Sequence, residues 1–120
     1  RRHAITLLEA TNLLLIPNRH VAKPGEKADN PGIEEPPEVI EALINHDRLT
    51  FENRVQRLRD ATMVTLAAID KKDAAALEES TYGIDDACES CHVIYWYPKD
   101  SLSQKLFQES QEQIGGKSKR

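Results

Sequence analysis

The sequence predicts an all-α fold, and two observations support it. Apolar residues recur at spacings of three and four along most of the 120 residues, as they do on one face of an α-helix. No stretch alternates apolar and polar side chains as a half-buried β-strand does. The length suits one modest hydrophobic core, so we expect residues 1–120 to form a single domain.

Strong helix breakers divide the first half of the chain. A helix is expected over residues 3–16, because its apolar face stops at Pro17. Prolines and glycines then predict a long irregular loop over residues 17–36. The next helical pattern covers residues 37–69, with a break expected near residues 46–50, where the apolar stripe changes phase.

The second half begins with a short polar turn that ends at Asp73, the expected N-cap of the following helix. That helix is expected over residues 74–97, since Pro98 would stop it. A shorter amphipathic helix is expected over residues 102–114. Two glycines follow it, and we expect a flexible tail over residues 115–120.

Charge and hydropathy argue against nucleic-acid binding and against a membrane-spanning helix. The formal net charge is −4 at pH 7, which is opposite to the basic surface of a nucleic-acid-binding protein. No apolar run approaches the roughly 20 residues of a membrane span. We therefore expect neither a nucleic-acid partner nor a membrane-spanning helix.

The strongest chemical signal is Cys-Glu-Ser-Cys-His at residues 88–92, which holds both cysteines of the chain. The C-x-x-C-H spacing is the attachment signature of a c-type haem. Cys88 and Cys91 lie about one helical turn apart, on one side of the backbone, and each sulfur can form a thioether with a haem vinyl group. His92 follows directly and supplies the proximal nitrogen ligand to the iron. The sequence therefore predicts one covalent haem c.

Two other interpretations of the cysteine pair are less favoured. A thioredoxin-like dithiol needs alternating strands and helices, which this chain lacks. A closed structural zinc site needs four ligands, and no second cysteine pair exists. No acid–base constellation or second metal motif is present, so we do not expect an enzyme, although weak peroxidase-like side activity is compatible with a haem.

The pattern around the motif resembles class II c-type cytochromes, the cytochrome c-prime type. The likeness rests on a haem motif near the C-terminal end of a helical chain, on Phe51 and Asp73, and on the aromatic ending of residues 88–98. It covers about residues 4–98. The resemblance implies a monohaem four-helix bundle that carries single electrons to a redox partner protein. It also implies export to the bacterial periplasm, with a leader that precedes Arg1.

The chain departs from that family at its start. Family members usually have a further helix upstream of the one at residues 3–16, and that helix covers the distal haem face and supplies any sixth iron ligand. We therefore expect an incomplete bundle whose haem the chain does not fully bury. Either residues 102–114 fold back over the first helix, or upstream sequence or a protein neighbour covers it.

The sixth iron ligand is left open by the sequence. Met63 is the only methionine and is more typical of gap-filling core than of a ligand. His3, His20 and His46 are the other candidates, and each is more typical of a surface or core residue.

Further side chains near the motif have expected roles. Tyr95 follows His92 by three residues, so we expect it beside the proximal side of the haem. Trp96 and Tyr97 are expected to point elsewhere, toward the long loop or a partner. Three arginines are candidates for pairing with haem propionates, although their spacing favours a solvated face: Arg54, Arg57 and Arg59.

Electron transfer is thus the leading functional hypothesis, because a covalent haem on a rigid helical scaffold passes single electrons. The second hypothesis is binding of NO or CO at a five-coordinate iron. The third is a haem-bearing subunit of a homo-oligomer or larger complex.

Overall fold

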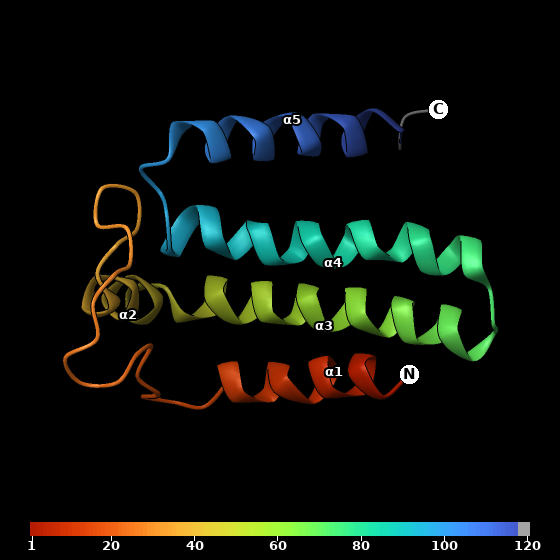
Figure 1. The fold of residues 1–120 in the computed structure, drawn as a ribbon, viewed down its shortest axis with the longest axis horizontal. Helices are drawn as coiled ribbons and strands as arrows, with labels where there is room; N and C mark the ends of the chain where they lie inside the picture. Colours follow the sequence, from red (N-terminus) through yellow and green to blue (C-terminus); the bar gives the residue numbers. More distant parts are fainter. Residues whose placement is uncertain (118–120) are drawn as a thin grey trace.

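The chain folds into helices, of which the first two are joined by a long loop and the others by short connections (Figure 1). This computed structural model describes residues 1–117, and in the last helix it describes the side chains up to residue 109 and those of residues 111 and 112. The helices are α1 (Arg2–Leu14), α2 (Pro37–His46), α3 (Arg48–Asp70), α4 (Ala74–Tyr95) and α5 (Ser101–Lys117). Residues 1–117 contain no strand, so the all-α prediction is confirmed. None of the described helices is both long and apolar enough to cross a lipid bilayer.

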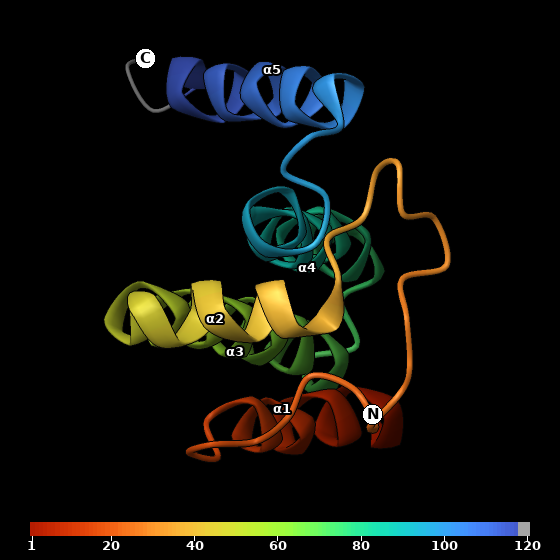
Figure 2. The same ribbon diagram turned by 90° about the vertical axis from the view of Figure 1, so that its left-hand side faces the viewer.

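The four longer helices lie side by side in the order α1, α3, α4, α5 (Figure 1). The contact between α3 and α4 is the most extensive, while α1 packs on the other side of α3 and α5 on the far side of α4. Figure 2 is turned by 90° so that the left-hand side of Figure 1 faces the viewer, and it shows α2 lying across the end of α3. α2 and the long loop therefore close one end of the row.

Two aspartates begin the helices that form the centre of the row. Asp47 interrupts the long helical pattern, and its carboxylate accepts a hydrogen bond from the Thr50 N–H at 3.1 Å. The expected break near residues 46–50 is thereby confirmed. Asp73 accepts from the Ala76 N–H at 3.0 Å, so its predicted role as an N-cap is also confirmed.

Three helix ends differ from the sequence prediction. α1 stops at Leu14, two residues early, where Arg19 and Arg48 donate to the last carbonyl groups of the helix. α4 stops at Tyr95 instead of residue 97. α5 continues to Lys117 through the glycine pair, because glycine costs a helix only about 1 kcal/mol relative to alanine. Residues 115–117, which were expected to belong to the tail, are thus part of α5, and residues 118–120 lie outside the described part.

Small side chains hold α1, α3 and α4 close together. Each of five buried hydroxyl residues donates its O–H to a carbonyl three or four residues earlier in its own helix, which satisfies the buried oxygen: Thr11, Thr62, Thr65, Ser80 and Ser90. A Cβ on Gly83 would meet the Ala61 Cβ at 3.8 Å. Larger apolar side chains gather instead at the α2 end, where Phe51, Val55 and Tyr95 form a buried cluster.

The row of helices stays open at both sides in the described residues. Among the helices, α1 packs only against α3, and α5 packs only against α4. The expectation that the last segment folds back over the first helix is therefore wrong. Gln104 donates to the Val93 carbonyl and Gln111 donates to Asp86, and these bonds hold α5 on the face of α4 opposite α1.

Candidate haem-binding cavity

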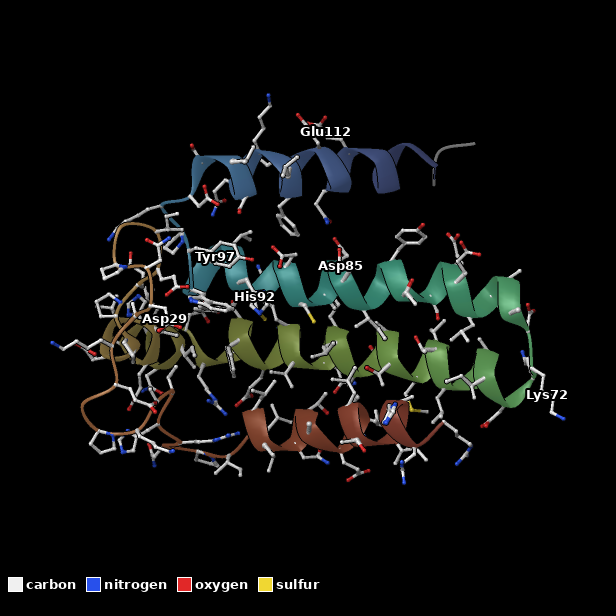
Figure 3. All side chains as sticks on the ribbon, viewed as in Figure 1. Asp29, Lys72, Asp85, His92, Tyr97 and Glu112 are labelled. Atoms are coloured by element: carbon white, nitrogen blue, oxygen red, sulfur yellow. The ribbon has the colours of Figure 1, made fainter. Side chains whose placement is uncertain are left out.

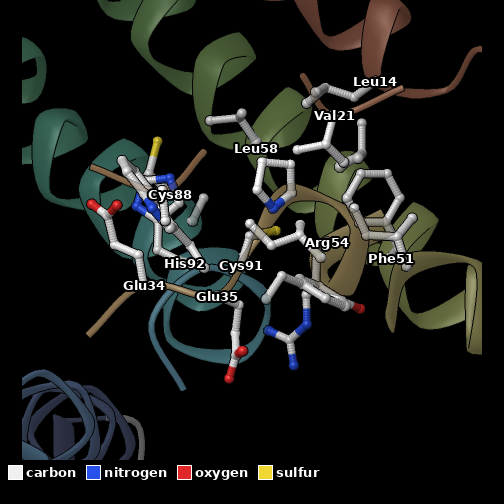
Figure 4. Close-up of a pocket in the computed structure, with 18 of the residues that line it drawn as sticks. Leu14, Val21, Glu34, Glu35, Phe51, Arg54, Leu58, Cys88, Cys91 and His92 are labelled. Atoms are coloured by element: carbon white, nitrogen blue, oxygen red, sulfur yellow. The ribbon is translucent and has the colours of Figure 1, made fainter. Parts of the chain in front are cut away.

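A cavity of about 420 Å³ lies at the α2 end of the row, within the range of about 300–1,000 Å³ that is usual for small-molecule sites. The structure brings all of the predicted site residues to its wall, namely Cys88, Cys91, His92 and Tyr95. Figure 4 shows both cysteines and His92 with side chains from α1, the loop and α3. Most of the remaining wall is apolar: Leu14, Val21, Ile40, Ile44, Phe51, Val55 and Leu58.

Both cysteines are half-buried free thiols on α4. Burial raises the pKa of the Cys88 thiol, and the nearby carboxylates of Asp85 and Glu89 raise it further. Burial also raises the pKa of Cys91, against a smaller opposite effect of Arg54. A nucleophilic C-x-x-C dithiol has a lowered thiol pKa, so this environment weighs against the dithiol interpretation.

His92 is held by a carboxylate on its own helix. Its Nδ1 lies 3.1 Å from Glu89 Oε1, and the side chains of both residues are 37 % exposed. An ionised carboxylate only accepts hydrogen bonds, so Nδ1 carries the proton and Nε2 keeps a lone pair for a metal. The Tyr97 O–H donates to Glu89 Oε2 at 2.6 Å. Figure 3 shows His92 and Tyr97 near each other at the α2 end of α4.

The rings of Trp96 and Tyr97 do not point where the sequence predicted. The backbone N–H groups of Trp96 and Tyr97 both donate to the His92 carbonyl, which turns the chain back after α4 ends. The Trp96 ring stands edge-on to His92 with centroids 5.1 Å apart, and the Tyr97 ring lies 5.8 Å away. The expectation that these two rings point elsewhere is therefore wrong. The expected contact with the loop does exist, because the Trp96 carbonyl accepts from the Glu35 N–H at 2.7 Å.

Tyr95 belongs to both the core and the cavity wall. It is 6 % exposed and packs edge-on against Phe51, with ring centroids 5.7 Å apart. Burial raises the pKa of its hydroxyl group. The overlap of core and site roles that its position predicts is therefore present.

Arg54 lines the cavity, so the solvated-face interpretation is wrong for this arginine. Its Nη1 donates to the Ser90 carbonyl at 2.8 Å, while its Nε is buried without a hydrogen-bond partner. Leaving such a group unpaired costs about 1–3 kcal/mol, and more when it is charged. Arg57 and Arg59 lie outside the cavity and bond to Asp86 and Asn12.

The four candidate sixth ligands lie away from the cavity. Met63 is on α3 and 48 % exposed. His20 bonds to Glu41 with its side chain 75 % exposed, and His3 and His46 are also exposed. Of the described residues that line the cavity, His92 alone carries an imidazole, and none carries a thioether.

The loop over residues 17–36 is fastened beside the cavity by Glu35, which is 8 % exposed. Its carboxylate pairs with Lys99 Nζ at 2.8 Å, and its N–H bonds to Trp96. Neither Glu35 nor Glu89 was predicted from the sequence as a site residue. The three-residue spacing from Glu89 to His92 is a usable signal for one contact, whereas no local pattern marks Glu35.

No known family, curated protein or solved structure matches this chain. The likeness to class II cytochromes therefore stays an expectation from the motif and its surroundings. What the cavity binds has to be argued from the groups that surround it.

Proposed function

We propose that this chain is a monohaem c-type cytochrome that carries single electrons in the bacterial periplasm. The observation that supports the proposal best is the convergence of Cys88, Cys91 and His92 on one largely apolar cavity. Their spacing alone predicts covalent haem attachment, independently of any cavity. A haem needs both the attachment residues and an apolar space beside them, and this chain has both.

The groups around the cavity fit a haem in three respects. Phe51, Val55 and Leu58 offer an apolar wall to a macrocycle. The Nε2 of His92 is available to iron, since Nδ1 is engaged by Glu89. Arg54 lines the cavity, and its guanidinium group is the kind of donor that pairs with a carboxylate such as a haem propionate.

A haem bound here supplies a one-electron couple at its iron. The chain's own part is to hold that group on rigid, closely packed helices, so that the surroundings rearrange little on electron transfer. Exchange with a redox partner protein belongs to the same proposal. So does completion of a cytochrome c-prime-like four-helix bundle by upstream sequence or a neighbouring chain at α1.

A second candidate function is binding of NO or CO at the iron. It is favoured by the apolar cavity-lining residues that other segments than α4 contribute. Leu14, Val21 and Ile40 come from α1, the loop and α2, whereas His92 is on α4. Distal-pocket polarity and access decide between gas binding and electron transfer. Sharp low-spin absorption bands that ignore CO support the electron carrier. A high-spin spectrum that shifts with CO supports the gas-binding protein.

Covalent attachment is the first test of the proposal. The chain, fused to an export leader, is produced in a bacterium with a c-type haem attachment system. Acid–acetone extraction is expected to leave the haem on the polypeptide. Cys88→Ala should keep the haem through the remaining thioether with an altered pyridine haemochrome band, and the double variant with Cys91→Ala should lose it. Ser80→Ala, a change on α4 outside the cavity wall, is the control and should retain the parent spectrum.

Haem released from the parent chain by acid–acetone would contradict the proposal. The same conclusion would follow if the double cysteine variant kept its haem through extraction.

A further inference from the structure

Glu89 lies between the imidazole of His92 and the hydroxyl group of Tyr97. One carboxylate oxygen is 3.1 Å from His92 Nδ1, and the other accepts from the Tyr97 O–H at 2.6 Å. Both contacts come from one short segment, because α4 ends at Tyr95 and the chain turns back over His92. The three side chains thus form a continuous hydrogen-bonded series that ends on the proximal imidazole.

We propose that Glu89, fixed by Tyr97, is a positioning residue that orients His92 and lowers the reduction potential of the haem iron. The inference rests on the proposed function, since it concerns the ligand of the same haem. A carboxylate that accepts from Nδ1–H raises the basicity of the imidazole toward the metal. A more basic ligand favours the oxidised iron, and second-shell hydrogen bonds are an established means of setting haem potentials.

Tyr97 is essential to this arrangement because Glu89 and His92 are both partly exposed. A partly exposed hydrogen bond to a carboxylate is weakly held on its own, since solvent competes for each group. The Tyr97 hydroxyl occupies one carboxylate oxygen and keeps the other directed at Nδ1. The Trp96 ring, edge-on to His92, limits rotation of the imidazole from a second side.

The test compares two substitutions that each remove one negative charge from α4. Glu89→Gln removes the carboxylate that bonds His92. Asp85→Asn removes an exposed carboxylate one helical turn before Glu89, and Figure 3 shows Asp85 farther from the α2 end of the row than His92 and Tyr97. Glu89→Gln is expected to shift the oxidised-to-reduced equilibrium at least tenfold toward the reduced form, which is about 59 mV upward for one electron. Asp85→Asn is expected to shift that equilibrium less than threefold.

Tyr97→Phe separates the fixing role of tyrosine from the charge of glutamate. With the hydroxyl group gone, the carboxylate turns toward solvent, so the potential is expected to rise, but by less than in Glu89→Gln. Equal shifts in Glu89→Gln and Asp85→Asn would overturn the proposal, because charge alone would then explain both. An unchanged or lowered potential in Tyr97→Phe would overturn the role given to Tyr97.

The outcomes are distinguishable from failure of the proposed function. Each variant is first assayed for covalently bound haem by its pyridine haemochrome spectrum, and unchanged absorption bands show that axial ligation is intact. A parent chain without bound haem refutes the cytochrome proposal itself. A parent and variants that all bind haem, with potentials that do not follow the order above, refute only the role of Glu89 and Tyr97.

Discussion

Arg54 and Arg59 occupy the same helix, five residues apart, yet their surroundings differ. Arg54 lines the cavity, bonds to the Ser90 carbonyl and has a buried Nε without a hydrogen-bond partner. Arg59 makes one long hydrogen bond, 3.5 Å, to Asn12 outside the cavity. Five residues along an α-helix correspond to a rotation of about 140°, so the two side chains lie on different faces of α3. A haem propionate is therefore expected to depend on Arg54 and not on Arg59.

Replacing these arginines one at a time tests that difference. Arg54→Met in the haem-loaded protein is expected to lower the free energy of unfolding by about 1.5–3 kcal/mol, the usual contribution of hydrogen bonds to a charged group. Arg59→Met is expected to change it by no more than about 0.5 kcal/mol, as surface substitutions usually do. Denaturant unfolding followed at the haem absorption band measures both. Equal losses in the two variants would show that Arg54 has no special bond to the haem.

Side-chain positions were predicted correctly from the sequence where residue spacing along a helix determines them. They were predicted wrongly where the position depends on the residue at which a helix ends. The positions of Cys88, Cys91 and His92 on one cavity follow from the motif on a helix. A helix that continued to residue 97 would separate Tyr97 from His92 by about 140°, and the Tyr97 ring would then point elsewhere, as expected. The helix ends at Tyr95 instead, and the turn brings the Tyr97 ring back onto His92.

At the scale of elements, the long loop is held by an attachment that lies far from it in sequence. Glu35 pairs with Lys99 and bonds to the backbone at Trp96, so the loop is tied to the segment that follows the haem motif. Prolines and glycines predicted the irregular backbone of residues 17–36. They carry no information on where the loop attaches, because that contact joins residues more than sixty positions apart in the chain.

Loss of the Lys99 attachment is expected to loosen the loop. Lys99→Met removes the charged partner of Glu35, and a hydrogen bond between charged groups contributes about 1.5 kcal/mol, which is roughly tenfold in an opening equilibrium. Trypsin should therefore cleave after Lys27 about tenfold faster, since cleavage follows the open population. Lys105→Met, which breaks the exposed pair of Lys105 with Glu109 on α5, is the control. Cleavage rates that do not differ between the two variants would argue against the attachment.

For the whole molecule, the sequence predicted the helical content but not the arrangement of the outer helices. Pro17, Asp47 and Asp73 mark boundaries by local chemistry, and a helix begins or ends within three residues of each of them. The placement of α5 depends on side-chain bonds from Gln104 and Gln111 to α4, which no periodicity reveals. Residues 102–114 were one alternative for covering the first helix, but Leu102 and Leu106 are 63 % and 56 % exposed on the opposite side of α4 from α1.

The position of α5 on the outer side of α4 predicts that the haem site does not depend on this helix. None of the described residues of α5 lines the cavity, which is walled by α1, the loop, α2, α3 and α4. A chain that ends after Asp100 is therefore expected to bind haem covalently and to keep the absorption spectrum and reduction potential of the full chain. Its free energy of unfolding is expected to fall, because the face of α4 that carries Val93 and Asp86 loses its covering. A changed haem spectrum in a truncated chain that still folds would mean that α5 contributes to the haem site, contrary to its position on α4.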